Sequence, residues 1–278
     1  MHPPFQNILL ATEHSEFDSG AERIAIEMAR RCRMPLAGVL PIASNPEYEA
    51  VAPQLAARAD AEAAARLREL QAAADAAGVV FECTVRRGSE LDQEIVQEAR
   101  AQGSDLIVAR RRGKRGFFAK LLVGEMVSRV VAHAPCSVLL VPRDCDLWSR
   151  KVLLALDPRS SPEAQQAPLQ AAMGVAAECG LPLAVVCVLD AEADRQAAQT
   201  LLAHVAEQAQ ALALRTETRV LSGKPYEQII AAADRTGADL IVMGRHGDTL
   251  SGRAWLGGTT QKVIGLAQRP VLVAIRKL

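Results

Sequence analysis

The stretch Gly237–Ala274 reads GADLIVMGRHGDTLSGRAWLGGTTQKVIGLAQRPVLVA and decides the fold. It opens with the apolar run LIVM, continues through a segment with glycines at 244, 247, 257 and 258, and closes with the apolar run VLVA. Short β-branched runs joined by helical stretches are typical of parallel strands with helical crossovers. The stretch therefore predicts strands near 239–243 and 270–275 with a helix at 258–268 between them.

The first half of the 278-residue chain repeats this pattern and extends it. Four of its segments have counterparts in the second half: NILLATE (7–13) in KVLLALD (151–157), MPLAGVLPI (34–42) in LPLAVVCVL (181–189), GSDLIVA (103–109) in GADLIVM (237–243), and SVLLV (137–141) in PVLVA (270–274). The offset between partners varies because the halves differ by insertions. We conclude that one structural unit occurs twice.

Both copies alternate strands with helices along their whole length. The predicted strands are 7–12, 36–42, 80–85, 105–109 and 137–141, then 151–156, 183–189, 216–221, 239–243 and 270–275. The predicted helices are 18–32, 53–77, 89–102 and 124–134, then 162–179, 193–213, 225–236 and 258–268. Right-handed crossovers make each copy a Rossmann-like, doubly wound α/β domain with five parallel strands in the order 3-2-1-4-5. The predicted domains are 1–144 and 148–278.

The amino-acid composition and the net charge exclude several classes of protein. Half of the residues are hydrophobic, and 32 basic residues balance 32 acidic ones, so the bulk charge gives no attraction to nucleic acid or acidic membranes. No apolar run reaches the length of about 20 residues that a membrane span needs. Six cysteines without a CxxC pair are typical of reduced, packed thiols. We therefore expect an ordered cytoplasmic protein without nucleic-acid or membrane partners.

The glycines of the second half predict an anion site. In an open parallel sheet, ligands collect at the carboxyl ends of the strands, where the strand order reverses. Gly244 and Gly247 follow the fourth strand of this half, and Gly257 and Gly258 open its last helix. Glycines allow close approach of the backbone, and the free N–H groups of a helix start favour a phosphate.

This segment resembles the nucleotide-binding signature of the universal stress proteins. The pattern G-x2-G-x9-G, the opening VLLALD, the ADLIVMG block and the closing PVLV together carry the resemblance. It covers the whole chain, which is similar to tandem-type members with two such domains. The resemblance implies an adenine nucleotide as ligand, ATP or AMP, with or without Mg²⁺.

The resemblance also implies roles for individual residues. The end of the first strand would face the nucleoside, the backbone at Val188 would read the adenine edge, and the glycine segment would hold ribose and phosphates. The candidate nucleotide-binding residues are Ala155, Leu156, Asp157, Val188, Met243, Gly244, Arg245, His246, Gly247, Gly257, Gly258, Thr259 and Thr260. The family usually carries Ser or Thr where this chain has Gly258, and Thr259 or Thr260 is the candidate substitute for that hydroxyl.

The first half departs further from the family pattern. Arg110 stands where Gly244 stands in the second half, and Glu125 follows Gly124 where Gly258 follows Gly257. A carboxylate about 4 Å from a phosphate costs on the order of 4 kcal/mol at an effective dielectric constant near 20. We therefore expect one intact nucleotide site, in the second half. The cations Arg110, Arg111, Arg112, Lys114 and Arg115 form either a solvated loop or a site for a different anion.

Motifs for catalysis are missing from the sequence. It has no G-x-S-x-G elbow and no G-x4-G-K-[ST] loop. His246 is expected to shape the glycine loop rather than to bind a metal, and isolated histidines such as His14 are expected to be surface or hydrogen-bonded residues. We expect no catalytic residues and no metal site; slow ATP hydrolysis and a phosphate-transferring enzyme of the same fold stay open.

The sequence thus predicts a nucleotide-binding stress-response protein that acts as a sensor or regulator. The rival is a carrier or scaffold whose first half binds an anionic or amphipathic metabolite through its arginine loop. The family resemblance implies that the apolar last strands, 138–141 and 271–275, pair with each other within one chain. A homodimer of the whole chain and unidentified protein partners complete the expectation.

Overall fold

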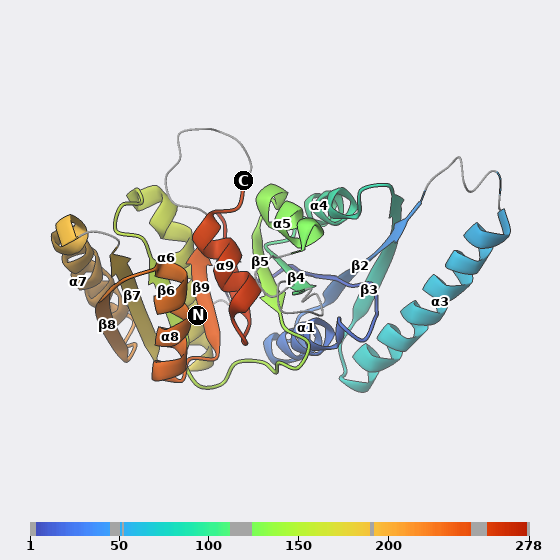
Figure 1. The fold of residues 1–278 in the computed structure, drawn as a ribbon. Coiled ribbons are helices and arrows are strands. Elements are labelled where there is room, and N and C mark those ends of the chain that lie inside the picture. The colour runs from blue at the N-terminus through green and yellow to red at the C-terminus, as the bar shows by residue number, and fades with distance from the viewer. Residues whose placement is uncertain are drawn as a thin grey trace.

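Ten strands form one continuous sheet in a computed structural model that describes residues 4–44, 51, 53–111, 124–189, 192–245 and 255–276. Their order is β3-β2-β1-β4-β5-β10-β9-β6-β7-β8 (Figure 1). The strands of the first half are β1 (Ile8–Ala11), β2 (Leu36–Ala43), β3 (Phe81–Gly88), β4 (Leu106–Arg110) and β5 (Ser137–Val141). Those of the second half are β6 (Val152–Leu156), β7 (Leu183–Leu189), β8 (Thr216–Ser222), β9 (Leu240–Gly244) and β10 (Val271–Ala274).

Helices connect the strands as the sequence predicts. The first half contains α1 (Ser19–Cys32), α3 (Pro53–Ala76), α4 (Leu91–Ala101) and α5 (Glu125–His133). The second contains α6 (Pro162–Cys179), the 3₁₀ turn η2 (Glu192–Asp194), α7 (Arg195–Ala211), α8 (Pro225–Thr236) and α9 (Gly258–Leu266). Most ends of the predicted strands and helices lie within two residues of the ends in the structure. The largest shift is in β3, which runs to Gly88 because Arg86 and Arg87 pair with β2 despite their polarity.

The two halves have the same topology, which confirms the predicted strand order 3-2-1-4-5 in each. All strand pairs within a half are parallel. The halves join through β5 and β10, which are antiparallel and place Val138 opposite Val273 and Leu139 opposite Leu272. The predicted pairing of the last strands within one chain is therefore confirmed. It removes two apolar edges that would otherwise be open to association.

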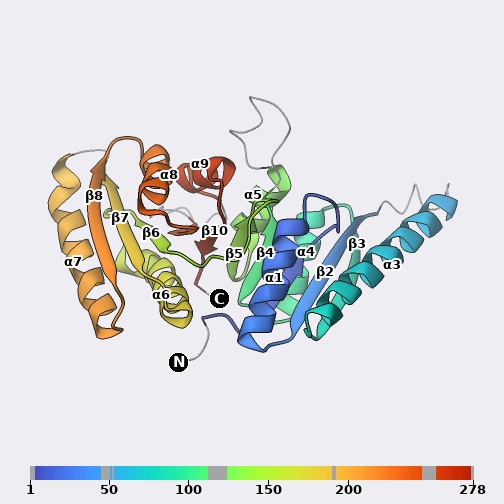
Figure 2. The same ribbon diagram turned by 90° about the horizontal axis from the view of Figure 1, so that it is seen from below.

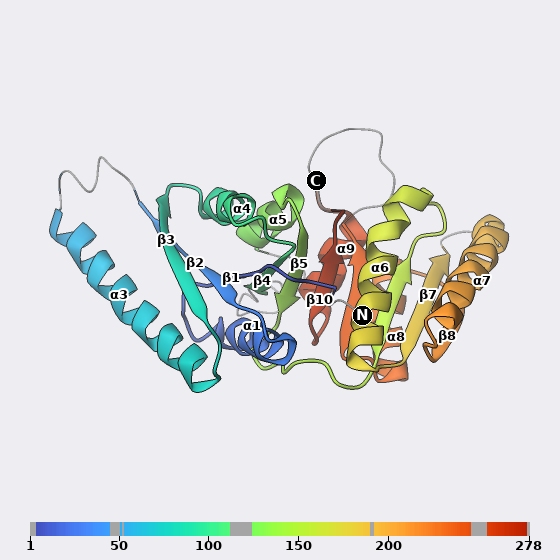
Figure 3. The same ribbon diagram turned by 180° about the vertical axis from the view of Figure 1, so that it is seen from behind.

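Two layers of helices cover the sheet, one on each face. Side chains of the strands pack against both layers. Ile8 and Leu10 of β1 pack in the same cluster as residues of α1, α3, α6 and α7, whereas Leu9 and Ala11 pack with α4, α5, α8 and α9. This is the alternation expected of a strand buried on both faces. Both hydrophobic clusters run through the two halves, so the halves share their cores. Figures 2 and 3 show the helices on either side of the sheet.

The ends of α6 are fixed by local sequence. Ser161 caps its start, where the hydroxyl accepts a hydrogen bond from the amide of Ala164 at 3.3 Å, and Pro162 occupies the first turn. Gly180 ends the helix in the left-handed region, at φ 63°. Among the described residues, no helix has the length and apolarity needed to cross a bilayer.

Candidate functional site

The carboxyl edge of the second half carries a pocket of about 440 Å³ at the point where the strand order reverses. Strand β6 lies between β7 and β9 there. From β6 the chain enters α6 on one face of the sheet, and from β9 it continues to α9 on the other. Because these two connections leave on opposite faces of the sheet, the strand ends between them stay uncovered. This is expected for a ligand site of this architecture.

Ten of the eleven predicted site residues that the structure describes line this pocket. They come from the ends of three strands and from the start of α9: Ala155, Leu156, Asp157, Val188, Met243, Gly244, Gly257, Gly258, Thr259 and Thr260. His246 and Gly247 lie outside the described residues. Sequence positions about a hundred residues apart thus meet at one edge of the sheet.

The start of α9 lines the pocket. Gly257 caps the helix, and its amide donates a hydrogen bond to the carbonyl of Arg245 at 3.0 Å. The first turn contains no acidic residue, and the amides of a first helical turn have no carbonyl partner within the helix. Gly258 is exposed, and a Cβ atom placed on it would meet no atom within 4 Å. An anion therefore has steric access to these amides, and the helix dipole favours it.

The two threonines after Gly258 have different environments. Thr260 is buried, and its hydroxyl donates to the carbonyl of Gly244 at 3.0 Å, which ties α9 to the end of β9. Thr259 is half-buried and lines the pocket. Of the two hydroxyls expected to compensate for Gly258, that of Thr260 is thus engaged with the backbone, and Thr259 stays the candidate for a ligand contact.

Arg245 does not line the pocket, contrary to expectation. Its Nη1 donates to the carbonyl of Ala132, at the end of α5 in the first half, at 2.9 Å. Burial lowers the pKa of this guanidinium. The side chain therefore connects the two halves, and only the backbone of Arg245 contributes to the site.

Sequence reasoning missed the side of the pocket that α6 and its approach provide. Arg159 forms an ion pair with Asp157, with Nε–Oδ1 and Nη2–Oδ2 distances of 3.1 Å. Gln165 donates to the carbonyls of Asp157 and Ser160 and so fixes this turn. The other lining residues that were not predicted are Ser160, Ala164, Pro168, Pro225, Ile229 and Trp255. The Asp-x-Arg spacing directly after the first strand was the available signal for Arg159.

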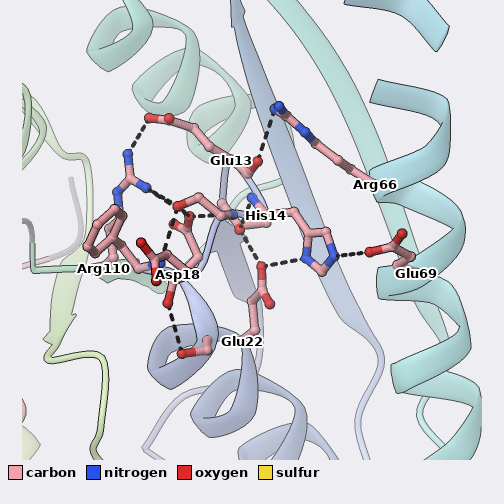
Figure 4. A network of polar contacts seen from close by, with 12 residues as sticks. Glu13, His14, Asp18, Glu22, Arg66, Glu69 and Arg110 are labelled. Carbon is pink, nitrogen blue, oxygen red and sulfur yellow. Dashed lines mark hydrogen bonds and ion pairs between the residues drawn. The ribbon is translucent and has the colours of Figure 1, made fainter. Parts of the chain in front are cut away.

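The corresponding position of the first half is filled by Arg110 (Figure 4). This arginine is only 4% exposed. Its Nη1 donates to Asp18 Oδ2 at 2.8 Å and to Ser15 Oγ at 2.7 Å, and its Nη2 lies 2.6 Å from Glu13 Oε1. A space of about 20 Å³ remains beside it. Arg110 therefore belongs neither to a solvated loop nor to an open anion site, which corrects both interpretations for this residue.

Arg111 is also engaged within the protein. Its Nη1 donates to the carbonyls of Ile264 and Gly265 at 3.2 Å and to that of Ala267, all at the end of α9. Arg112, Lys114 and Arg115 lie outside the described residues. Glu125 forms an exposed ion pair with Arg129 at 2.7 Å. The two described arginines of the basic run thus serve internal contacts.

His14 continues the network around Arg110. Its Nδ1 lies 3.0 Å from Glu22 Oε1 on α1, and its Nε2 lies 3.0 Å from Glu69 Oε2 on α3. Burial lowers the pKa of His14, but the two carboxylates outweigh burial, and the net shift is upward. The prediction of a hydrogen-bonded histidine is confirmed. In the described parts of the chain, no three His, Cys, Asp or Glu side chains are grouped as a metal site would need.

Comparison with known proteins identifies a family to which this chain is similar. A model of the universal stress protein family matches residues 4–142 and again 149–274. The universal stress protein Slr1230 of Synechocystis is 30% identical over 170 residues, which cover 60% of this chain and 57% of that protein. The universal stress protein MJ0577 of Methanocaldococcus jannaschii is 41% identical over 58 residues, 21% of this chain and 36% of that protein. The matches thus span about half or less of the length of these relatives.

Among solved structures, a universal stress protein from Archaeoglobus fulgidus superposes over nearly the whole chain. The TM-score is 0.76 at 21% identity, and the alignment covers 99% of this chain and 98% of that one. At this identity the similarity establishes the shared fold of the paired domains.

Proposed function

The chain belongs to the universal stress protein family, and on that basis we propose that it is a cytoplasmic sensor or regulator that binds one adenine nucleotide, ATP or AMP, in its second half. The observation that carries the proposal is the pocket at the carboxyl edge of β6 and β9, which is lined by the open first turn of α9. The six cysteines are all free thiols, in keeping with a reducing compartment.

The pocket offers separate environments for the parts of a nucleotide. Val188, Met243 and Ile229 supply apolar contact for a base. The Asp157 carboxylate accepts hydrogen bonds at the rim, and Arg159 supplies a cation beside it. The amides of Gly258 and Thr259 would donate hydrogen bonds to phosphate oxygens. A volume of about 440 Å³ is within the usual range of ligand sites, about 300–1,000 Å³.

Trp255 adds a large aromatic side chain to the rim, where it is 40% exposed. A base can stack on an indole, and such stacking contributes about 1–3 kcal/mol in single-stranded nucleic-acid complexes. Trp255 precedes Gly257 by two residues, so a base stacked on it would lie near the start of α9.

A regulatory role is supported by what α9 contacts at its other end. The start of this helix forms the nucleotide pocket, and its last carbonyls accept hydrogen bonds from Arg111 of the first half. Ligand contacts at one end of a nine-residue helix can therefore bias the interface between the halves. The rival carrier function loses support because Arg110 is paired and the first half offers about 20 Å³ at that position.

The matched variants Gly258→Glu and Gly258→Gln test the proposal. The site has room for a side chain, and Gly258→Glu gives the second half the acidic residue that Glu125 provides in the first. We expect AMP and ATP to raise the melting temperature of the wild type. A carboxylate in the first turn should weaken nucleotide binding about a hundredfold, roughly 2.7 kcal/mol, whereas glutamine should change it less than about fivefold.

The measurement is a thermal-shift titration, followed by calorimetry of both variants. A melting temperature of the wild type that stays constant at millimolar AMP and ATP would refute nucleotide binding. Equal affinity of the glutamate and glutamine variants would place the phosphates away from the start of α9.

A further inference from the structure

In each half, the acidic residue that follows the first strand is paired with an arginine, but the two arginines differ in exposure. Glu13 follows β1 and Asp157 follows β6, at corresponding positions of the repeat. The partner of Glu13 is Arg110, whose side chain is 5% exposed. The partner of Asp157 is Arg159, whose side chain is 53% exposed. The second pair therefore lies where a ligand can reach it.

The guanidinium of Arg159 is oriented by contacts at the end of β6. Its Nε lies 3.1 Å from Asp157 Oδ1 and its Nη2 lies 3.1 Å from Oδ2, so both carboxylate oxygens accept hydrogen bonds from it. The backbone amide of Arg159 also donates to Oδ1, at 3.0 Å. Gln165 holds the same turn through the carbonyls of Asp157 and Ser160. A two-point ion pair of this kind fixes the direction of the guanidinium at the wall of the nucleotide pocket.

The charge balance of the pocket depends on this pair. Asp157 and Arg159 are the only charged side chains among the described residues that line the pocket, and their formal charges cancel. Without the arginine, the carboxylate would repel a phosphate. At a separation of about 8 Å and an effective dielectric constant of about 40, one unit charge changes the affinity about fivefold for each charge on the ligand. Arg159 therefore favours ligands with negative charge.

An uncharged nucleoside meets the same pair as a competitor. Both oxygens of Asp157 already accept hydrogen bonds from Arg159, so a hydroxyl or amino donor of the ligand competes with the guanidinium for the carboxylate. A phosphate instead accepts from the guanidinium, whose planar set of donors suits phosphate oxygens, and leaves the carboxylate to the donors of the ligand. Exposed ion pairs contribute little to stability, so this exchange of partners costs little.

We propose that Arg159 makes the pocket selective for phosphorylated nucleosides over uncharged nucleosides, because it exchanges Asp157 for a phosphate of the ligand when a nucleotide binds. This inference rests on the proposed nucleotide function and names the residue that selects the charge of the ligand. The preference grows with the number of phosphates. In the first half, the buried Arg110 stays paired with Glu13 and Asp18 and makes no such exchange.

The variant Arg159→Gln tests this selectivity, with Arg219→Gln as the matched control. Arg219 also pairs with an acidic residue two positions earlier, Glu217, and its side chain is 54% exposed, but it does not line the pocket. Calorimetry of the full chain gives the affinities for adenosine, AMP and ATP. We expect Arg159→Gln to weaken AMP about tenfold and ATP more, and to tighten adenosine about twofold. Arg219→Gln should change each affinity less than about twofold.

Two further measurements separate charge from structure. Arg159→Lys keeps the charge and should keep most of the affinity for AMP, and added salt should reduce the difference between the wild type and Arg159→Gln. Equal weakening of adenosine and AMP by Arg159→Gln would overturn the inference, as would a loss no larger than that of Arg219→Gln. A wild type that binds adenosine as tightly as AMP would also overturn it but leave the proposed function intact. A wild type that binds neither would refute the proposed function and this inference with it.

Discussion

One residue position separates the two halves chemically. Gly244 and Arg110 each end the strand next to the first strand of their half. In the second half the glycine leaves the strand ends open to a pocket, and in the first half the arginine side chain occupies that place. The guanidinium of Arg110 forms ion pairs with Glu13 and Asp18. The side chain of Arg110 therefore fills the position in the first half that is open in the second.

Removal of Arg110 is therefore expected to destabilise the protein strongly. Arg110→Met keeps an unbranched apolar stem but leaves Asp18, which is 1% exposed, as a buried carboxylate without its cation. Breaking a buried pair in this way typically costs about 3–5 kcal/mol, and the partial exposure of Glu13 favours the lower end. Urea unfolding measures the change.

Two further variants complete this experiment. Arg129→Met removes a half-exposed cation whose short ion pair, with Glu125, is exposed and whose contacts with Glu90 and Asp92 are long, at 4.0 and 3.9 Å. It should cost less than about 1 kcal/mol. Neutralising the carboxylates together with the arginine, in Glu13→Gln/Asp18→Asn/Arg110→Met, should recover part of the lost stability. A cost for Arg110→Met as small as that of Arg129→Met would contradict the structural role assigned to Arg110.

At the scale of elements, α3 is attached to the rest of the first half partly through polar contacts. Few of its residues are buried, among them Leu70 and Ala74, and the helix lies at the outer end of the molecule (Figure 1). Arg66 donates to the carbonyl of Glu13 at 3.2 Å, and Glu69 contacts His14. The polar contacts therefore supplement a narrow apolar seam.

The His14 contacts predict a pH dependence for this attachment. Burial opposes protonation, but Glu22 from α1 and Glu69 from α3 both favour it, and the pKa in the folded state is raised. A raised folded-state pKa means that the stabilisation is fully present below the unfolded value, near 6.5, and is lost as the pH rises through the folded value. We expect the unfolding free energy to fall by about 0.2–1 kcal/mol over this window.

Equilibrium unfolding between pH 5.5 and about 8.5 tests this point, with His14→Gln as the comparison. The glutamine variant should lose the difference between low and high pH while the remaining titrations persist. Hydrogen exchange should also show faster opening of α3 at the higher pH. Identical pH profiles of the wild type and the variant would exclude His14 as the responsible group.

At the scale of the whole molecule, the two halves are joined by a reciprocal pair of arginines in addition to β5 and β10. Arg111 follows β4 and contacts the end of α9, and Arg245 follows β9 and contacts the end of α5. Cations near the C-terminus of a helix are favourable because they meet its unpaired carbonyls. We propose domain limits of 1–144 and 148–278 around this junction. A homodimer of the whole chain stays a prediction.

The pseudo-symmetric chain is expected to bind one nucleotide rather than two. Only the second half offers both the open strand ends and a first helical turn without an acidic residue among the described residues. Isothermal titration with AMP, or native mass spectrometry, should give a stoichiometry of about one per chain. A value of two would require a second site that the Arg110 network does not occupy.

The sequence by itself determined the duplicated α/β fold, the strand order and the main candidate residues of the pocket. These features follow from local patterns, because apolar runs, helical stretches and glycines report on backbone structure where they occur. Tertiary structure alone decided the roles of Arg110, Arg111 and Arg245, whose partners lie 92 to 156 residues away. It also decided that α6 contributes Gln165 to the pocket and that Trp148 lines a cavity between the halves. The role of a charged or aromatic side chain depends on the groups that it contacts after folding. The linear sequence does not specify those contacts.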